Sequence, residues 1–344
     1  MLDAAVAFLL APLHRLLDLG DPFSAASLAG TAIFAAVVML RRRGRAPGRP
    51  GIAARLARLR ALVRAGFSAH VWAHPSSRLD LKPFFVTSFF YATGVVELVV
   101  TSQAVETTVA GGLEGAFGRI DHAPAGLALV VAVTVLDFPI FELACWFAHW
   151  LLHRVPALWS FHALHHSAEV LTPMSEWRQH PIELFLIPAI NAAMLGAFWG
   201  LTRFLFGPSA QPVSLIGFNA IQLVAVFTVL HLRHTRLWIT VPGIWAKLLQ
   251  TPAHHQIHHS ADPRHFDKNL GLFLSLWDRV FGTLWIPRPE EARTLVLGIG
   301  EGAAHRGVVD AWMRPCVEAM RTFRPARPAA PPTTIAPTRL PAAE

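Results

Sequence analysis

Histidine is concentrated in one region of this sequence. The chain of 344 residues contains 18 histidines, and 12 of them fall between positions 149 and 259. Eight of these form three compact groups, which are His149 and His153, then His162, His165 and His166, then His255, His258 and His259. Residues three and four apart on a helix share one face, so each group would present its imidazoles together.

Imidazoles grouped in this way indicate metal binding. Neutral imidazole is the commonest nitrogen ligand for zinc, copper and iron. Eight exceed what one tetrahedral ion can use, so the pattern predicts a site for two metal ions. Taken alone, the pair His149 and His153 also has an explanation without a metal, as polar side chains that reach the membrane surface from the end of a span. The prediction therefore depends on the doubled histidine that recurs in the other two groups.

The composition indicates an integral membrane protein. Hydrophobic residues make up 53% of the chain and charged residues only 15%, whereas a soluble domain usually carries about 25% charged residues. The net charge of +8 is also uneven, because nine arginines fall between Arg41 and Arg64. In a membrane protein such a cluster predicts a cytoplasmic segment that contacts anionic lipid, and we expect no nucleic-acid partner.

The apolar runs predict an all-α, multi-pass helical membrane protein with about five spans. These runs are 22–40, 83–101, 124–150, 181–206 and 213–230. The last two form a predicted hairpin around the Gly/Pro segment 207–212, and the Gly-rich stretch 103–122 is predicted to be a loop. With the arginines in the cytoplasm, counting the spans brings all three histidine groups to the cytoplasmic face, as a histidine-rich helical cap.

Three segments resemble the sterol desaturase and fatty acid hydroxylase superfamily, in its bacterial type. They are 137–167, in which Arg154, Pro156 and Trp159 lie among the histidines, then 251–260, then 274–283. The resemblance covers roughly residues 84–284. It implies a membrane enzyme with a cytoplasmic di-iron centre, in which zinc can replace iron. Such an enzyme uses O2 to hydroxylate or desaturate a C–H bond of a lipid of sterol or fatty-acyl type.

The resemblance also suggests how the chain is divided. Residues 1–82 would form an N-terminal span and a basic amphipathic segment on the membrane surface, in which 52–67 is a predicted helix with a break before it at 46–50. Residues 83–287 would form the hydroxylase-like catalytic domain. Residues 288–344 would form a polar C-terminal segment, whose Pro/Ala-rich end, 326–344, is predicted to be disordered.

The same resemblance implies the ligand set. The eight grouped histidines match the histidine boxes of the superfamily, and His234 matches a further ligand that follows a span. Arg236 stands where many bacterial members have Asn, which leaves the number of ligands in this segment open. His231 could join His234 on one helix face. His180 lies in a segment that resembles a family motif and is either a ligand or a structural residue.

Three acidic residues are candidates to orient the imidazoles through hydrogen bonds. Glu142 precedes His149 by seven residues, on the same helix face, and Asp137 and Asp278 are the others. A carboxylate inside an apolar span is costly unless it is paired. The alternative for Asp137 and Glu142 is therefore a structural pair with another helix.

The electrons for such a reaction must come from a separate protein. The two cysteines cannot hold an iron–sulfur cluster, no flavin or nucleotide motif is present, and His180–Pro181 lacks the glycines of a cytochrome b5 haem motif. We therefore expect a ferredoxin or a cytochrome b5-like donor with its reductase, a lipid substrate from the bilayer, and a location in the bacterial inner membrane. The alternative is a metal- or haem-binding membrane protein without enzymatic activity, such as a transporter, whose ligands would be spread through the spans.

Overall fold

The computed structural model describes residues 2–41, 51–66, 68–93, 101–300 and 307–323. The described chain is predominantly helical, which confirms the predicted fold class in its coarse form. A short antiparallel pair, β1 (Ser214–Leu215) and β2 (Phe218–Asn219), interrupts the helices. The predicted break at 46–50, the arginines of the cluster that fall within 42–50, and the tail at 326–344 lie outside the described residues.

Two helices are long and apolar enough to cross a membrane in the described chain, α7 (Leu127–Arg154) and α9 (Pro181–Phe206). Their 28 and 26 residues correspond to about 40 Å of helix, against a hydrocarbon core of about 30 Å. The start of α9 is fixed by its sequence, because Pro181 occupies the first turn and Glu183 closes a capping box with His180. Both helices follow the predicted spans closely.

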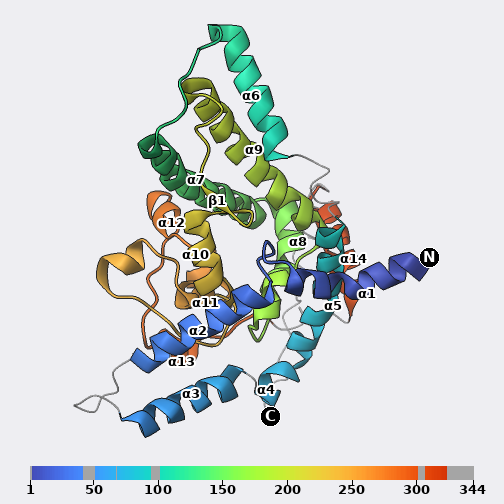
Figure 1. Cartoon of the computed structure of the whole chain (residues 1–344). Helices are drawn as coiled ribbons and strands as arrows, with labels where there is room; N and C mark the ends of the chain where they lie inside the picture. Colours follow the sequence, from blue (N-terminus) through green and yellow to red (C-terminus); the bar gives the residue numbers. More distant parts are fainter. Residues whose placement is uncertain (1, 42–50, 67, 94–100, 301–306, 324–344) are drawn as a thin grey trace, which may run out of the picture.

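The helix α6 (Ser102–Phe117) lies where the sequence predicted a loop, so that prediction is wrong. Four glycines in 103–122 suggested the loop, but close packing on α9 stabilises a helix instead. Gly196 and Gly200 of α9 let the two backbones approach, since a Cβ on Gly196 would lie 2.6 Å from Val105 Cβ. Figure 1 shows α6, α7 and α9 extending together from the rest of the molecule.

Replacing Gly200 by Val should separate α6 from α9. The added Cβ would lie 2.7 Å from Val109 Cβ and 2.8 Å from the Glu106 carbonyl oxygen, so we expect a loss of about 1–3 kcal/mol from overpacking. The thermal unfolding midpoint of the detergent-solubilised protein measures this loss. Gly115→Ala is the control, because a Cβ there meets nothing within 4 Å. An unchanged midpoint for Gly200→Val would contradict the close packing.

The remaining predicted spans are shorter or interrupted. The segment 213–230 is not one continuous helix, because it contains the strand pair and then the nine-residue α10 (Ala220–Thr228). The segment 83–101 falls partly in α5 (Pro75–Ala92), and residues 94–100 lie outside the described chain. The segment 22–40 forms α2 (Ala25–Arg41), with 17 residues. The count of five spans therefore stays a prediction.

The N-terminal helices pack around the domain that carries the histidines. Here α1 (Leu2–Leu17) lies along α5, and α2 lies along α10. The predicted amphipathic helix forms as α3 (Ile52–Gly66), and the short α4 (Ala69–Trp72) leads into α5. Phe23, Phe84 and Trp177 form a small aromatic core where these helices meet the rest of the chain.

Short helices meet at the C-terminal end of α7. They are α8 (Pro156–His166) and α11 (Pro252–His258), which carry five of the nine histidines predicted as ligands, and the single 3-10 turns η2 (Pro173–Trp177) and η3 (Leu230–Leu232). Both α8 and α11 begin with proline in the first turn, where its missing N–H costs nothing. The chain continues through η4 (Gly243–Lys247), η5 (Pro263–His265), α12 (Leu276–Val280), α13 (Glu291–Thr294) and α14 (Val308–Thr322), which packs on α8.

Candidate metal centre

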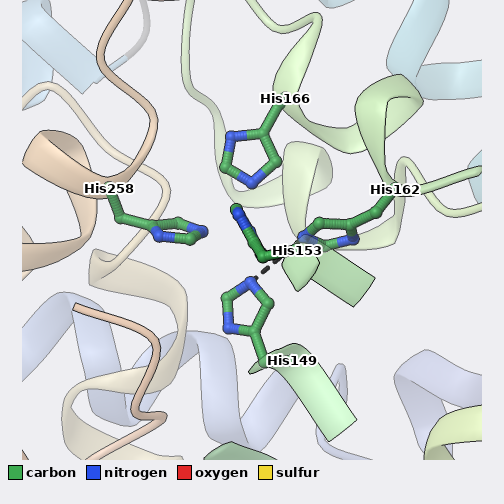
Figure 2. A group of neighbouring side chains, drawn as sticks. All are labelled: His149, His153, His162, His166 and His258. Carbon is green, nitrogen blue, oxygen red and sulfur yellow. Dashed lines mark hydrogen bonds between the residues drawn. The ribbon is translucent and has the colours of Figure 1, made fainter. Parts of the chain in front are cut away.

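The structure brings the nine histidines predicted as ligands together in two groups. The five-histidine group contains His149, His153, His162, His166 and His258. The four-histidine group contains His165, His234, His255 and His259. Within each group, one nitrogen from every residue lies within 4.8 Å of all the others. Figure 2 shows the five-histidine group, whose rings point toward a common centre.

The two groups interleave along the chain. Helix α8 gives His162 and His166 to the five-histidine group but His165 to the other. Around α11, His255 and His259 join the four-histidine group, while His258 joins the five-histidine group. Residues four apart share a helix face, and a neighbouring residue is turned by about 100°. Each doubled histidine therefore serves both groups.

The four-histidine group has the spacing that a metal ion requires. His234 Nε2 lies 2.8 Å from His255 Nε2 and 3.2 Å from His165 Nε2. His255 Nε2 and His259 Nε2 are 3.1 Å apart. Two metal–nitrogen bonds of about 2.1 Å at right angles place their nitrogens about 3.0 Å apart. Because a neutral imidazole carries only one N–H, four converging nitrogens fit a shared cation better than they fit hydrogen bonds among themselves.

The five-histidine group shows the same need for a cation. His149 Nε2 and His162 Nε2 are 3.0 Å apart, the contact drawn as a dashed line in Figure 2. The Nε2 atoms of His153, His166 and His258 are buried and have no hydrogen-bond partner among the described residues. A buried polar atom without a partner is unfavourable. A metal ion at the common centre would satisfy all three.

Burial keeps the imidazoles in the form that binds metals. For His165, His166 and His258, burial and then the charge of neighbouring histidines lower the pKa well below the usual 6.5. The pKa values of His255 and His259 are lowered in the same direction. Near pH 7 these rings are neutral, and a lone pair is available on each.

Three carboxylates fix the orientation of the rings by bonding to the nitrogen that faces away from the centre. Glu183 Oε2 lies 2.7 Å from His162 Nδ1, and Glu183 is fully buried. Glu176 Oε2 lies 2.8 Å from His234 Nδ1. Asp267 Oδ1 lies 3.4 Å from His153 Nδ1. The sequence prediction missed all three, although such partners are a regular feature of histidine metal sites.

Two backbone carbonyls orient further rings. His149 Nδ1 donates to the Leu270 carbonyl and His258 Nδ1 donates to the Lys268 carbonyl, each at 2.8 Å. Both carbonyls belong to one loop that follows η5, where Asn269 adopts a positive φ of 57°. Asn269 in turn donates from Nδ2 to the His254 carbonyl on α11. The loop therefore connects the first and third histidine segments.

The three acidic residues that the sequence singled out have other direct partners. Asp137 accepts from Trp199 Nε1 of α9 at 2.7 Å, which is the interhelical pairing given as the alternative. Glu142 accepts from the backbone N–H groups of Phe273 and Leu274, at 2.9 and 2.7 Å. Asp278 acts one step away from the imidazoles, because it accepts from the N–H of Leu270, whose carbonyl orients His149.

The two weaker ligand candidates lie outside both groups. His180 is the N-cap of α9, and its Nε2 lies 3.1 Å from the Trp312 carbonyl of α14. His231 Nε2 lies 2.9 Å from the Pro22 carbonyl and 3.0 Å from Ser27 Oγ, both near the start of α2. His180 therefore connects α9 to α14, and His231 connects η3 to the start of α2.

The described chain is helical and contains two long apolar helices, α7 and α9. Two groups of histidines lie at the end of α7. This is the architecture of a membrane-bound metalloprotein. Residues 134–283 match the model of the fatty acid hydroxylase family, and this segment holds all nine histidines. This match confirms the superfamily resemblance seen in the sequence.

Curated relatives match part of the chain. Alkylglycerol monooxygenase of Danio rerio is 33% identical over 138 residues, which are 40% of this chain and 27% of that protein. The human alkylglycerol monooxygenase is 30% identical over 138 residues, which are again 40% of this chain and 27% of that protein. Ornithine lipid hydroxylase OlsE of Rhizobium tropici is 32% identical over 179 residues, 52% of this chain and 48% of that protein. The chain thus spans less than half of these relatives, and no solved structure gives a significant match.

Proposed function

We infer that this chain is a membrane-bound oxidoreductase that uses O2 and external electrons to hydroxylate, or desaturate, a C–H bond of a lipid. The observation that carries this inference is the convergence of nine histidines, seven of them buried and two half-buried, into two groups within a fatty acid hydroxylase domain. Two iron ions held by these groups, which zinc can replace, would supply the activation of O2 and the oxidation of the C–H bond.

In this proposal the residues of the chain hold and shield the centre. The nine histidines each direct one nitrogen inward, and Glu176, Glu183 and Asp267 keep three of the rings from turning. Burial of the four-histidine group excludes bulk water from the reacting region. The proposed catalytic domain is residues 83–287, which the N-terminal segment (residues 1–82) and the C-terminal segment (residues 288–344) flank.

The proposed substrate is a membrane lipid that reaches the centre from the bilayer. The curated relatives are named for an alkylglycerol and for ornithine lipid, which supports a lipid with a polar headgroup alongside the sterol or fatty-acyl types. The histidines lie at the C-terminal end of α7 and beside the N-terminal end of α9. If these helices cross the bilayer, the centre lies at the membrane surface, where a lipid can enter laterally.

The proposed location is the bacterial inner membrane, in a multi-pass topology with the centre facing the cytoplasm. The basic segment 41–64 supports this orientation, because cytoplasmic segments are enriched in arginine and contact anionic lipid. The cytoplasm also supplies electrons through soluble carriers. We propose a ferredoxin, or a cytochrome b5-like protein with its reductase, as the donor.

Metal analysis and isotope labelling test this function together. Protein purified without added metal should contain about two irons per chain, as expected for two ligand groups. Cells that express the chain under ¹⁸O2 should accumulate a lipid with one ¹⁸O, or a lipid with one more double bond, and cells with an empty vector should not. One tightly bound zinc that iron cannot replace, or an unchanged lipid profile in cells with an active donor, would count against the oxygenase.

A further inference from the structure

Arg15 is buried in an aromatic box at the end of α1. Its side chain is 2% exposed, and its guanidinium carbon lies 3.8 Å from the ring centroid of Trp177 and 5.0 Å from that of Tyr91. Asp21 neutralises the charge through two hydrogen bonds, of 2.7 and 3.0 Å. A buried guanidinium is tolerated when it is paired in this way and stacked on aromatic faces.

The box leads directly to the four-histidine group. Trp177 follows Glu176 on the single turn η2, and Glu176 Oε2 lies 2.8 Å from His234 Nδ1. The middle of η2 is held separately, because Ser175 Oγ donates to Asp80 of α5 at 2.8 Å. At the end of η2 nearest to the histidines, the stack on Arg15 holds the Trp177 ring, and Thr87 Oγ1 donates to the Trp177 carbonyl.

The N-terminal helices also hold the segment that carries His234. His231, three residues earlier, bonds to the Pro22 carbonyl and to Ser27, and its ring meets Phe23 edge-on with centroids 5.7 Å apart. The same N-terminal region thus contacts the two segments that carry Glu176 and His234, through Trp177 and His231. It lies outside the segment 134–283 that matches the family model.

We propose that Arg15 is a positioning residue for the four-histidine group. Its guanidinium fixes Trp177, so that the adjoining Glu176 stays aligned with His234 Nδ1 while His234 Nε2 faces the other three rings. This proposal rests on the proposed metal binding. It assigns the N-terminal helices a role in holding the metal centre. It also predicts that loss of the stack between Arg15 and Trp177 weakens metal binding at the four-histidine group and not at the five-histidine group, because none of the five-histidine rings bonds to η2 among the described contacts.

The test compares Arg15→Ala with Phe8→Leu in full-length protein reconstituted in nanodiscs. Phe8 packs α1 on α5 through Phe85 and Phe89 and so controls for general loosening of α1. Metal-depleted protein is titrated anaerobically with Fe²⁺ against a competing chelator. Wild type should bind two ions, and Arg15→Ala should bind one as wild type does and the other about 10- to 100-fold more weakly, the usual cost of losing an outer partner of a ligand.

Three results would overturn the role of Arg15: two unchanged affinities in Arg15→Ala, an equal loss at both groups, or the same one-site loss in Phe8→Leu. Failure of the wild type to bind Fe²⁺ would instead remove the proposed function. A double-mutant cycle adds a second readout, because in a Glu176→Gln background Arg15→Ala should weaken binding less than about twofold further. If Arg15→Ala does not fold, Arg15→Lys takes its place in the same cycle, because lysine keeps the charge but loses the planar stack. Fully additive losses of Fe²⁺ affinity from the two substitutions would reject the coupling between residues 15 and 176.

Discussion

The His255→Ala variant is expected to lose the metal ion of the four-histidine group and, with it, all lipid oxidation. His255 Nε2 lies 2.8 Å from His234 Nε2 and 3.1 Å from His259 Nε2, so it shares the inner side of the group with both. Removing a direct ligand should lower the metal affinity by more than the roughly 10- to 100-fold loss that follows removal of a residue that hydrogen-bonds to a ligand. Iron per chain, measured on purified protein, should fall from about two to about one.

The adjacent residue provides a matched control. His254 is as deeply buried as His255, but its Nδ1 lies 2.7 Å from Thr251 Oγ1 and it belongs to neither group. His254→Ala should cost the start of α11 about 1 kcal/mol through the lost capping contact and should keep both ions. Equal metal content in the two variants, whether high or low, would show that the assignment of His255 is wrong.

The Asp278→Ala variant should show the largest loss of stability. Asp278 is fully buried and accepts hydrogen bonds from five groups, which are the N–H of Leu270, the N–H of Gly271, Trp146 Nε1, Gln250 Nε2 and Thr283 Oγ1. Each donor left buried without a partner costs about 1–3 kcal/mol. We therefore expect a loss of several kcal/mol in the free energy of unfolding.

The same change should disturb the five-histidine group, because Asp278 holds Leu270, whose carbonyl orients His149. Thermal unfolding in detergent, with metal-loaded and metal-depleted samples run in parallel, separates the two effects. Asp262→Ala is the control, since Asp262 pairs locally with the exposed Arg264 and caps only the three-residue η5, so its loss should lower the midpoint far less than the loss of Asp278. Similar midpoints for the two variants would mean that the Asp278 network is not a major source of stability.

The sequence was sufficient to predict the residues that gather at the centre. Histidines at helical spacing are a local pattern, and His162, His165 and His166 keep that relation in the folded chain because α8 forms as expected. The division of each box between two groups was not predicted. It depends on how α8 and α11 are turned toward each other, which packing determines and spacing does not.

The carboxylate partners could not be predicted for a related reason. Glu176 and Glu183 lie in segments that come next to the histidines only when η2 and α9 pack against α8, and Asp267 lies in a loop with a positive φ of 57°. No periodicity connects such distant positions. The prediction of a loop at 103–122 was wrong because glycines in a sequence usually indicate a break in a helix. The glycines that determine the structure here are Gly196 and Gly200 on the partner helix α9, which let α6 pack closely against it.

The interleaved histidines have a mechanical consequence. His165 and His166 are covalent neighbours, as are His258 and His259, and the Cα atoms of such neighbours are separated by about 3.8 Å. Each neighbouring pair directs one ring to each group, so the two pairs limit how far apart the two groups can lie. Neither group can shift along the chain without moving the other, and the distance between two ions held by these groups would therefore be set by two peptide bonds.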